Sequence, residues 1–268
     1  MTQRIHDRTR VLFVSIWAAA LFMSGTASAL ESEGQVTAIP VPFGPGEELV
    51  FDISYGPVQA GEASLVVRGI VQSNGATCYH VESTAQSSRF YSTFYKVRDK
   101  VVSHFGVDDL VSRYFSKRLH EGEYRKNIQV HFDQDEHKAH YKDGRSFDIA
   151  PECHDILAAF YVVRTLPLDD GEPAHVKTHS SRENYDLEVI VHGRETVEVP
   201  AGRFDCIKVE PVIKGEGLFQ FEGQILIWLT DDERRLPVLM KTQIKIGAVD
   251  ASLSSYTPGT IGVKGNGS

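Results

Sequence analysis

The chain has 268 residues, of which 41% are hydrophobic, 10% aromatic and 24% charged, with 22 glycines and 11 prolines. These proportions are those of an ordinary globular protein, and they exclude a wholly disordered, collagen-like or coiled-coil chain. The 28 basic and 36 acidic side chains give a formal net charge of −8, which offers no overall electrostatic attraction for nucleic acid or an anionic membrane.

The first 29 residues have the organisation of a secretory signal peptide. Arg4, Arg8 and Arg10 precede an apolar stretch over 11–23, and Ala27-Ser28-Ala29 supplies the small residues that signal peptidase accepts. The apolar stretch is shorter than the roughly 20 residues that span a bilayer, so we expect cleavage after Ala29 rather than an N-terminal anchor. Cleavage leaves 25 basic and 35 acidic side chains, a net charge of −10. No later segment is long and apolar enough to cross a membrane, which predicts a soluble periplasmic protein.

The mature chain is expected to hold one folded region between two flexible ends. Residues 30–45 are rich in proline and lack periodicity, and residues 257–268 contain four glycines and no large aromatic residue. Neither segment can bury enough apolar surface to offset the entropy of ordering, so we expect a flexible leader and a flexible tail. The β-rich domain is then 46–256, with halves over 46–150 and 168–256 on either side of a helix.

Alternating and β-branched runs dominate this domain and predict strands. Turn sequences such as Asn74-Gly75 and Asp143-Gly144 separate them. The predicted strands cover 49–55, 63–71, 78–83, 128–132, 187–191, 196–199, 206–209, 224–229 and 238–246. Because strands at such short spacing favour antiparallel meanders, we predict a mainly β fold with a curved antiparallel sheet, either a half-barrel or a barrel.

One segment has helical periodicity instead. Its apolar residues recur at intervals of three and four, namely Ile156, Leu157, Phe160 and Val163. Asp155 is a suitable N-cap, Arg164 carries a cation that suits the C-terminal end of the helix dipole, and Pro167 prevents continuation. We therefore predict one helix near 155–165 that packs against the sheet.

A weak internal similarity links the two halves of the domain. The segment 77–82 (Thr-Cys-Tyr-His-Val-Glu) resembles 205–210 (Asp-Cys-Ile-Lys-Val-Glu). Two similar β-units joined by the helix would produce this pattern, and a chance resemblance between two short strands is the alternative.

Three cysteines, Cys78, Cys153 and Cys206, allow one disulfide in an oxidising compartment. If the two units stack in matching register, the pair is Cys78–Cys206. None of the three lies in a CxxC motif, which argues against thiol redox chemistry and against a cysteine-rich zinc site.

Sequence motifs of catalysis and cofactor binding are absent. There is no HExxH, no GxSxG, no phosphate-binding loop and no GxGxxG after a strand, so no cofactor is implied. Two groups of histidines are candidate metal ligands: His131, His137 and His140, and then His175 and His179. Their loop and strand positions favour solvated histidines over metal ligands. Acidic pairs such as 108–109 would serve a glycosidase only if two carboxylates faced each other across a sugar, about 5 to 10 Å apart.

Aromatic residues are the candidate ligand contacts. A curved sheet around an apolar cavity would use them to hold a lipid or a sugar, and packing in an ordinary β core is the alternative use. The candidates are Phe90, Tyr91, Phe94, Tyr95, Tyr114, Phe219, Phe221 and Trp228. Nearby, Arg89, Lys96, Arg98 and Lys100 add positive charge, for which we prefer a solvated strand edge to an anion site.

Short motifs along the chain resemble a known family. They include Gly193 to Val197, then Pro200-Ala201-Gly202-Arg203-Phe204, then Trp228-Leu229-Thr230-Asp231, and then Leu236-Pro237-Val238. By their order and spacing, they resemble the bacterial exported family catalogued as domain of unknown function 3108, over about residues 43 to 256. The resemblance implies an envelope-associated β-rich protein and carries over no catalytic residue. A similar strand style occurs in periplasmic lipoprotein carriers, whose half-barrels hold acyl chains, and this analogy concerns the fold alone.

Export, an aromatic-rich β pattern and the lack of catalytic motifs together predict a non-enzymatic periplasmic protein. It would bind an apolar or amphipathic envelope component, or assist its assembly. An envelope polysaccharide hydrolase with paired carboxylates is one alternative, and a structural partner in an envelope complex is another. The expected partners are a lipid, a glycan or an envelope protein, and not nucleic acid.

Overall fold

The structure, a computed structural model, describes residues 40–169, 171, 173–213, 224–243 and 247–263, so the predicted signal peptide (1–29) lies outside the described residues. Strands dominate, as predicted. They are β1 (Pro40–Val41), β2 (Glu48–Tyr55), β3 (Val58–Ser73), β4 (Ala76–Ser87), β5 (Arg98–Gly106), β6 (Ser112–Glu121), β7 (Tyr124–Asp133), β8 (Lys138–Tyr141), β9 (Ser146–Asp148), β10 (Ala174–Ser180), β11 (Glu183–Val199), β12 (Gly202–Ile213), β13 (Ile225–Thr230), β14 (Pro237–Gln243), β15 (Ala248–Thr257) and β16 (Gly262–Val263). The helices are the short 3-10 helix η2 (Tyr91–Thr93) and α2 (Ile156–Val163).

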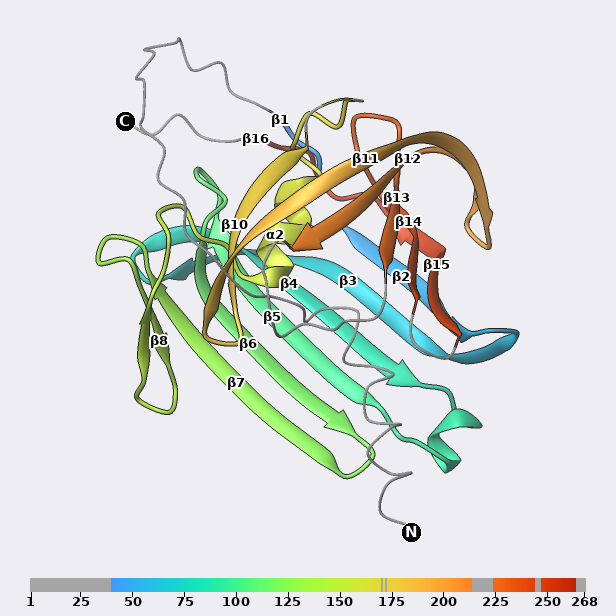
Figure 1. Cartoon of the computed structure of the whole chain (residues 1–268), viewed down its shortest axis with the longest axis horizontal. Helices are drawn as coiled ribbons and strands as arrows, with labels where there is room; N and C mark the ends of the chain where they lie inside the picture. The colour runs from blue at the N-terminus through green and yellow to red at the C-terminus, as the bar shows by residue number, and fades with distance from the viewer. Residues whose placement is uncertain (1–39, 170, 172, 214–223, 244–246, 264–268) are drawn as a thin grey trace.

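Strands β2 to β15 form one antiparallel sheet of 14 strands, in the order β10-β11-β12-β13-β14-β15-β2-β3-β4-β5-β6-β7-β8-β9. The sheet curves strongly around α2 (Figure 1). In the described part of the chain its two edges do not pair as strands, but side chains connect them. The Tyr141 hydroxyl lies 3.0 Å from Nε2 of His179, and Nδ2 of Asn184 donates to the carbonyl of Asp148 at 2.8 Å. The predicted curved antiparallel sheet is confirmed, and its form is a half-barrel whose edges meet through side chains.

The sequence patterns do not predict every long strand, and β6 shows why. Its side chains alternate between the two faces of the sheet, but basic residues occur on both faces: Lys117 is buried, whereas Arg118 is exposed. The alternation of apolar and polar residues is therefore lost in the sequence, although the backbone still pairs with β5 and β7 along nearly its whole length.

Helix α2 lies inside the curve of the sheet, and all of its residues from Leu157 to Val163 are buried. Because it is apolar on every side, it fills the interior of the half-barrel rather than covering one face. At its C-terminal end, the ring centroid of Phe43 lies 5.5, 6.0 and 4.8 Å from those of Tyr79, Phe105 and Tyr161. The predicted packed helix is confirmed.

Buried polar side chains hold both ends of α2. Asp155 is the N-cap, as predicted, and one of its oxygens accepts two backbone N–H groups of the first turn at 2.9 and 3.0 Å. Its other oxygen accepts from the hydroxyls of Ser103 and Ser112, each at 2.6 Å, which fastens the helix to β5 and β6. At the other end, the guanidinium of Arg164 binds the two oxygens of Glu47 at 2.7 and 2.8 Å, and both side chains are fully buried. Arg164 therefore does more than complement the helix dipole.

The packed chain is longer than the predicted domain. β1 pairs with β16, and Val41 and Phe43 are 1% and 0% exposed. The flexible leader predicted over 30–45 and the flexible tail predicted over 257–268 are therefore too long. Each of these segments supplies the hydrogen-bond partner of the other, and composition alone does not reveal such a long-range pairing.

The two similar segments of the sequence lie on β4 and β12, in equivalent surroundings. The partner strand of each has a register shift at a glycine with positive φ. Gly69 (φ 151°) lies opposite His80 on β4, and Gly193 (φ 114°) lies opposite Lys208 on β12. Each segment therefore lies beside a bulge at a glycine, and the duplication itself stays a prediction.

The cysteines do not form the predicted disulfide. Cys78, Cys153 and Cys206 are all buried free thiols. Five strands of the continuous sheet separate β4, which carries Cys78, from β12, which carries Cys206. The predicted pairing is wrong because the two units extend one sheet side by side instead of stacking in register.

Candidate functional site

The concave face of the half-barrel contains an apolar hollow beyond α2. Its wall consists of seven neighbouring strands, from β14 through β15 and β2 to β6. The side chains around it are Phe51, Ile53, Ala63, Ser64, Leu65, Ser83, Ala85, Asp99, Val101, Lys117, Leu119, Met240 and Ala251. The cavity between these side chains has a volume of about 50 Å³, and part of it opens to solvent. A largely apolar concave surface with a few polar groups is typical of a small-molecule site.

Lys117 is the cation of this hollow. It lies on β6 between Phe115 and Leu119, which also face inward, and it is only 8% exposed. Among the described residues its ammonium group forms no hydrogen bond or ion pair. Burial lowers the pKa of Lys117, and the negative charges of Asp99 and Glu121 oppose this effect in part. Lys117 is thus a poorly solvated cation without a direct partner.

Two carboxyl groups, those of Asp99 and Glu121, interact electrostatically with Lys117. Glu121 is 1% exposed, and one of its carboxyl oxygens is buried without a hydrogen-bond partner in the described part of the chain. Burial and the negative charge of Asp99 raise the pKa of Glu121 to about 8, and burial also raises the pKa of Asp99. The raised pKa favours the protonated form of Glu121 at neutral pH.

A second hollow of about 60 Å³ adjoins the first, and Lys117 and Leu119 line both. His179 lies at its far end and is 2% exposed, so it is not the solvated histidine that the sequence predicts. Its two ring nitrogens lie 3.0 Å from the Tyr141 hydroxyl and 2.8 Å from Oδ1 of Asn184. Burial lowers the pKa of His179, so a neutral ring joins the two edges of the sheet here.

The aromatic cluster over 90–95 does not line either hollow. It forms the connection between β4 and β5, where Phe90 and Phe94 are 67% and 78% exposed. Tyr91 and Tyr95 in the same connection are half-buried. The sequence therefore predicts an aromatic cluster correctly, but the structure places it at the end of the sheet rather than on the concave face.

The other aromatic candidates are also outside the hollow. Tyr114 lies on the face of β6 opposite to Phe115, and its ring centroid is 5.1 Å from those of both His104 and His131. Trp228 is buried, and its Nε1 donates to Glu195 at 2.6 Å. Phe219 and Phe221 lie outside the described residues.

The sequence contained one signal that points to the hollow. Lys117 stands between two apolar residues that share its face of a strand, a place where an ordinary core has another apolar side chain. Reading that signal requires knowing that 112–121 is a strand and which of its faces is concave.

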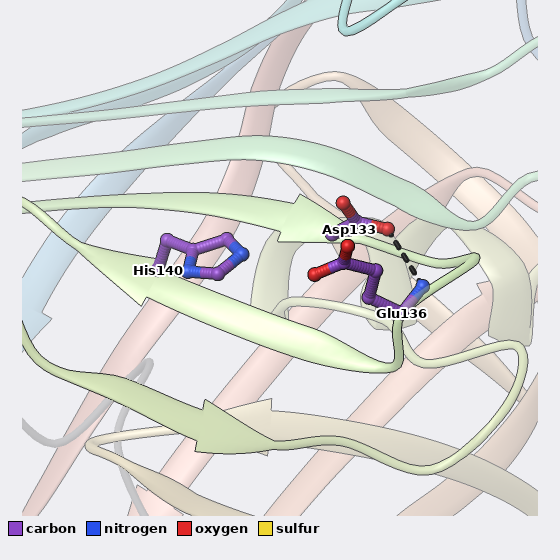
Figure 2. A group of neighbouring side chains, drawn as sticks. All are labelled: Asp133, Glu136 and His140. Atoms are coloured by element: carbon purple, nitrogen blue, oxygen red, sulfur yellow. Dashed lines mark hydrogen bonds between the residues drawn. The ribbon is translucent and has the colours of Figure 1, made fainter.

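Asp133, Glu136 and His140 form a cluster of metal-ligand types at the β7–β8 turn (Figure 2), with their ligand atoms within 4.8 Å of one another. The turn itself accounts for this arrangement. Oδ1 of Asp133 accepts the backbone N–H groups of residues 135 and 136 at 3.1 and 2.8 Å, and Nδ1 of His140 lies 2.8 Å from the hydroxyl of Ser146. We assign no metal to this surface cluster.

The fold and the hollow define the class of protein: an incomplete antiparallel β-barrel with an internal helix and an apolar concave face. The profile of the family described as protein of unknown function (DUF3108) matches residues 50–254, and the chain belongs to this family. The resemblance predicted from the sequence is thus confirmed. None of the described helices is long and apolar enough to span a membrane.

One solved structure shares this fold, and a second gives a weaker match. A β-barrel-like protein of DUF1849 from Brucella abortus is similar with a TM-score of 0.59 and 8% identity, over 82% of this chain and 100% of that chain. A candidate lipoprotein from Parabacteroides distasonis gives a TM-score of 0.37 and 11% identity, over 81% of this chain and 99% of that chain. No curated protein matches the sequence.

Proposed function

We propose that the protein is an exported periplasmic binding protein that holds the apolar chain of an amphipathic envelope molecule in the hollow and catalyses no reaction on it. One observation carries the proposal: an open apolar hollow on the concave face contains a buried lysine without a direct partner. A polar group inside an apolar pocket commonly fixes the orientation of the ligand.

The ligand that suits this hollow has an apolar chain and an acidic group. Desolvating an ammonium group is costly, and a carboxylate or phosphate beside Lys117 would offset that cost with a charge-assisted hydrogen bond. The raised pKa of Glu121 favours this binding, because its protonated form adds no negative charge beside Lys117. Aliphatic side chains such as Leu119 and Met240 then contact the chain of the ligand.

Native mass spectrometry of the protein purified from its own periplasm tests the proposal directly. We expect a bound acidic amphiphile that organic solvent extracts. Protein that carries no lipid, and that does not bind a fluorescent fatty acid after purification, would contradict the proposal. A bound glycan or a protein partner in place of a lipid would favour the other predicted classes.

Two variants identify the site. Leu119→Trp fills the hollow and should abolish binding of the fluorescent fatty acid, whereas Lys117→Met should weaken it about tenfold or more, the loss expected for one charge-assisted hydrogen bond. Lys241→Met is the matched control, because Lys241 follows the wall residue Met240 on β14 and points to the other face, where it forms an ion pair with Asp250 at 3.4 Å. If the Lys117 and Lys241 variants bind the fluorescent fatty acid equally well, Lys117 does not contact the ligand.

A further inference from the structure

Exposed apolar side chains gather at one end of the sheet. Seven large apolar side chains of the described residues are exposed, and four of them, Val58, Phe90, Phe94 and Tyr124, lie in or next to three connections at this end. These are the β2–β3 turn, the β4–β5 connection and the β6–β7 hairpin. Backbone hydrogen bonds join these three connections. The N–H of Ser88 in the β4–β5 connection donates to the carbonyl of Ala60 near the β2–β3 turn at 2.8 Å, and the N–H of Gly122 in the β6–β7 hairpin donates to the carbonyl of Lys96 in the β4–β5 connection at 2.7 Å. We call this end the tip; the β4–β5 connection and the β6–β7 hairpin project there, away from α2 (Figure 1).

Basic side chains surround these apolar groups. They are Arg89, Lys96, Arg98, Arg118, Arg125 and Lys126, and all six are exposed. The exposed carboxylates beside them are Glu123 in the β6–β7 hairpin and Glu62 on β3, which lies in the same row of the sheet as Arg98. The tip is thus strongly positive, although the whole chain has a formal net charge of −8.

Part of the positive charge at the tip lacks a partner within the described part of the chain. Lys100 on β5 lies directly opposite Arg118 on β6, which is an unfavourable pairing within a sheet. Lys100 has a partner in Glu82 at 2.8 Å, but among the described residues the side chain of Arg118 has neither a hydrogen bond nor an ion pair. Such unneutralised charge indicates an anionic partner outside the chain.

The aromatic connection is held in a defined shape. The hydroxyls of Ser87 and Ser92 lie 2.7 Å apart, and the Ser87 hydroxyl also accepts the N–H of Val97 at 2.9 Å. The rings of Phe90 and Phe94 pack edge to face with centroids 5.6 Å apart. These hydrogen bonds hold the β4–β5 connection in a shape that exposes the rings of Phe90 and Phe94 side by side. Residues that only packed the core would not need such a shape.

We propose that the tip is a docking surface for an anionic membrane, with Phe90 and Phe94 entering the interfacial region of the bilayer while the surrounding basic side chains contact lipid phosphates. Aromatic side chains favour the interface between lipid and water, and basic residues are attracted to an anionic bilayer surface within a Debye length. The aromatic and basic side chains lie together at the tip. This arrangement favours a membrane over a soluble anion, because a soluble anion offers no apolar region for the rings of Phe90 and Phe94. The solvated strand edge preferred from the sequence leaves the exposed rings without a role.

Docking at the tip would place the hollow next to the membrane. A groove on the surface of the tip lies between basic side chains such as Arg98, Arg118 and Lys126. Ala85, Asp99 and Leu119 line both this groove and the hollow. A lipid could then pass between the bilayer and the hollow over a short distance. Only this last step rests on the function proposed above; membrane docking itself stands on the tip residues alone.

Sedimentation of the exported chain with vesicles tests the docking. Vesicles of phosphatidylcholine mixed with phosphatidylglycerol should bind the protein, and high salt should release it from them. Vesicles of pure phosphatidylcholine should bind it at least about tenfold more weakly. The variants Phe90→Ser/Phe94→Ser and Arg98→Gln/Arg118→Gln/Lys126→Gln should each lose about tenfold or more of the binding. Controls of the same kind away from the tip are Ile70→Ser, at an apolar site that is 46% exposed, and Arg145→Gln.

Fluorescence separates insertion of the rings from simple charge attraction. Phe90→Trp should give a blue-shifted emission with the anionic vesicles and no shift with soluble glycerol phosphate, and all variants should keep the circular dichroism of the unaltered chain. Equal binding to both kinds of vesicle, unaltered binding by both tip variants, or a spectral shift with glycerol phosphate alone would overturn the proposal. The tip variants should still bind the soluble fatty acid and Lys117→Met should still bind vesicles, so failure of docking and failure of the hollow are distinguishable.

Discussion

The buried ion pair between Arg164 and Glu47 should be one of the most costly contacts to break in this protein. It joins the C-terminal end of α2 to the start of β2, and both side chains are 0% exposed. The guanidinium also donates to the backbone carbonyl of Arg234 at 3.1 Å and lies over the rings of Phe43 and Tyr161, with its central carbon 5.3 and 5.2 Å from their centroids. We therefore choose Arg164→Met as the perturbation, because methionine keeps much of the volume and removes the charge.

The expected loss of stability follows from what the substitution leaves behind. Without Arg164, the carboxylate of Glu47 is buried and has lost two charge-assisted hydrogen bonds of 2.7 and 2.8 Å. Removing one partner of a buried ion pair costs about 3 to 5 kcal/mol, which is a large part of the roughly 5 to 15 kcal/mol that stabilises a typical domain. The double variant Glu47→Leu/Arg164→Met leaves no buried charge, so it should be much less destabilised than the sum of the two single variants.

Urea unfolding followed by circular dichroism and by the fluorescence of the buried Trp228 measures these free energies. Arg145→Met is the matched control, because Arg145 pairs with Asp143 at the surface and loss of an exposed pair costs about 0 to 1 kcal/mol. A loss below about 1 kcal/mol for Arg164→Met, or strict additivity in the double variant, would refute the reasoning.

Three further predictions concern buried polar groups. Asp155→Ala should destabilise the protein by about 3 kcal/mol or more, because it removes the N-cap and leaves two buried hydroxyls without an acceptor. Urea unfolding should show a smaller loss of stability for Asp155→Asn. Equal losses for the two variants would contradict the capping role. The pKa of Glu121 is raised by burial and by Asp99 from 4.5 to about 8, so its stabilising contribution is complete below pH 4.5 and is lost as the pH rises through about 8. The free energy of unfolding should therefore fall by a few kcal/mol between pH 5 and pH 9 in the unaltered protein, and by much less in Glu121→Gln. The exposed control Glu123→Gln should keep the full pH dependence. Parallel curves for all three proteins would exclude the raised pKa of Glu121. Burial raises the pKa of Cys78 and Cys206 to about 11 and of Cys153 to about 12, so a thiol reagent should label none of them in the native protein and all three after unfolding without reductant, whereas a single reactive thiol after unfolding would reveal a disulfide.

Local chemistry in the sequence predicts part of the secondary structure: the predicted strands fall on eight of the fourteen strands of the sheet, and β5, β6, β8, β9, β10 and β15 are missed. The alternation over 49–55 and 78–83 arises because successive side chains of a strand point to opposite faces, and β2 and β4 form there. The helix near 155–165 follows from its three- and four-residue apolar spacing and from Asp155, whose side chain caps it. These features depend on neighbours in the chain, so the sequence is sufficient to find them.

The candidate site could not be found in the same way, because it depends on which strands become neighbours. Asp99 raises the pKa of Glu121 only because β5 and β6 are paired neighbours in the sheet. The predicted ligand contacts Phe90 and Phe94 are exposed instead, because the β4–β5 connection projects beyond the sheet.

The amino-acid sequence by itself determined the β class, the single helix with its cap and the membership of the DUF3108 family, because each is written in local periodicity or in short motifs. The tertiary structure alone decided that the sheet stays an open half-barrel, that β1 and β16 extend the fold, that the cysteines remain apart and that Lys117 faces the hollow. Those features arise from the curvature of a continuous sheet and from pairings between distant segments, which no local pattern of residues specifies.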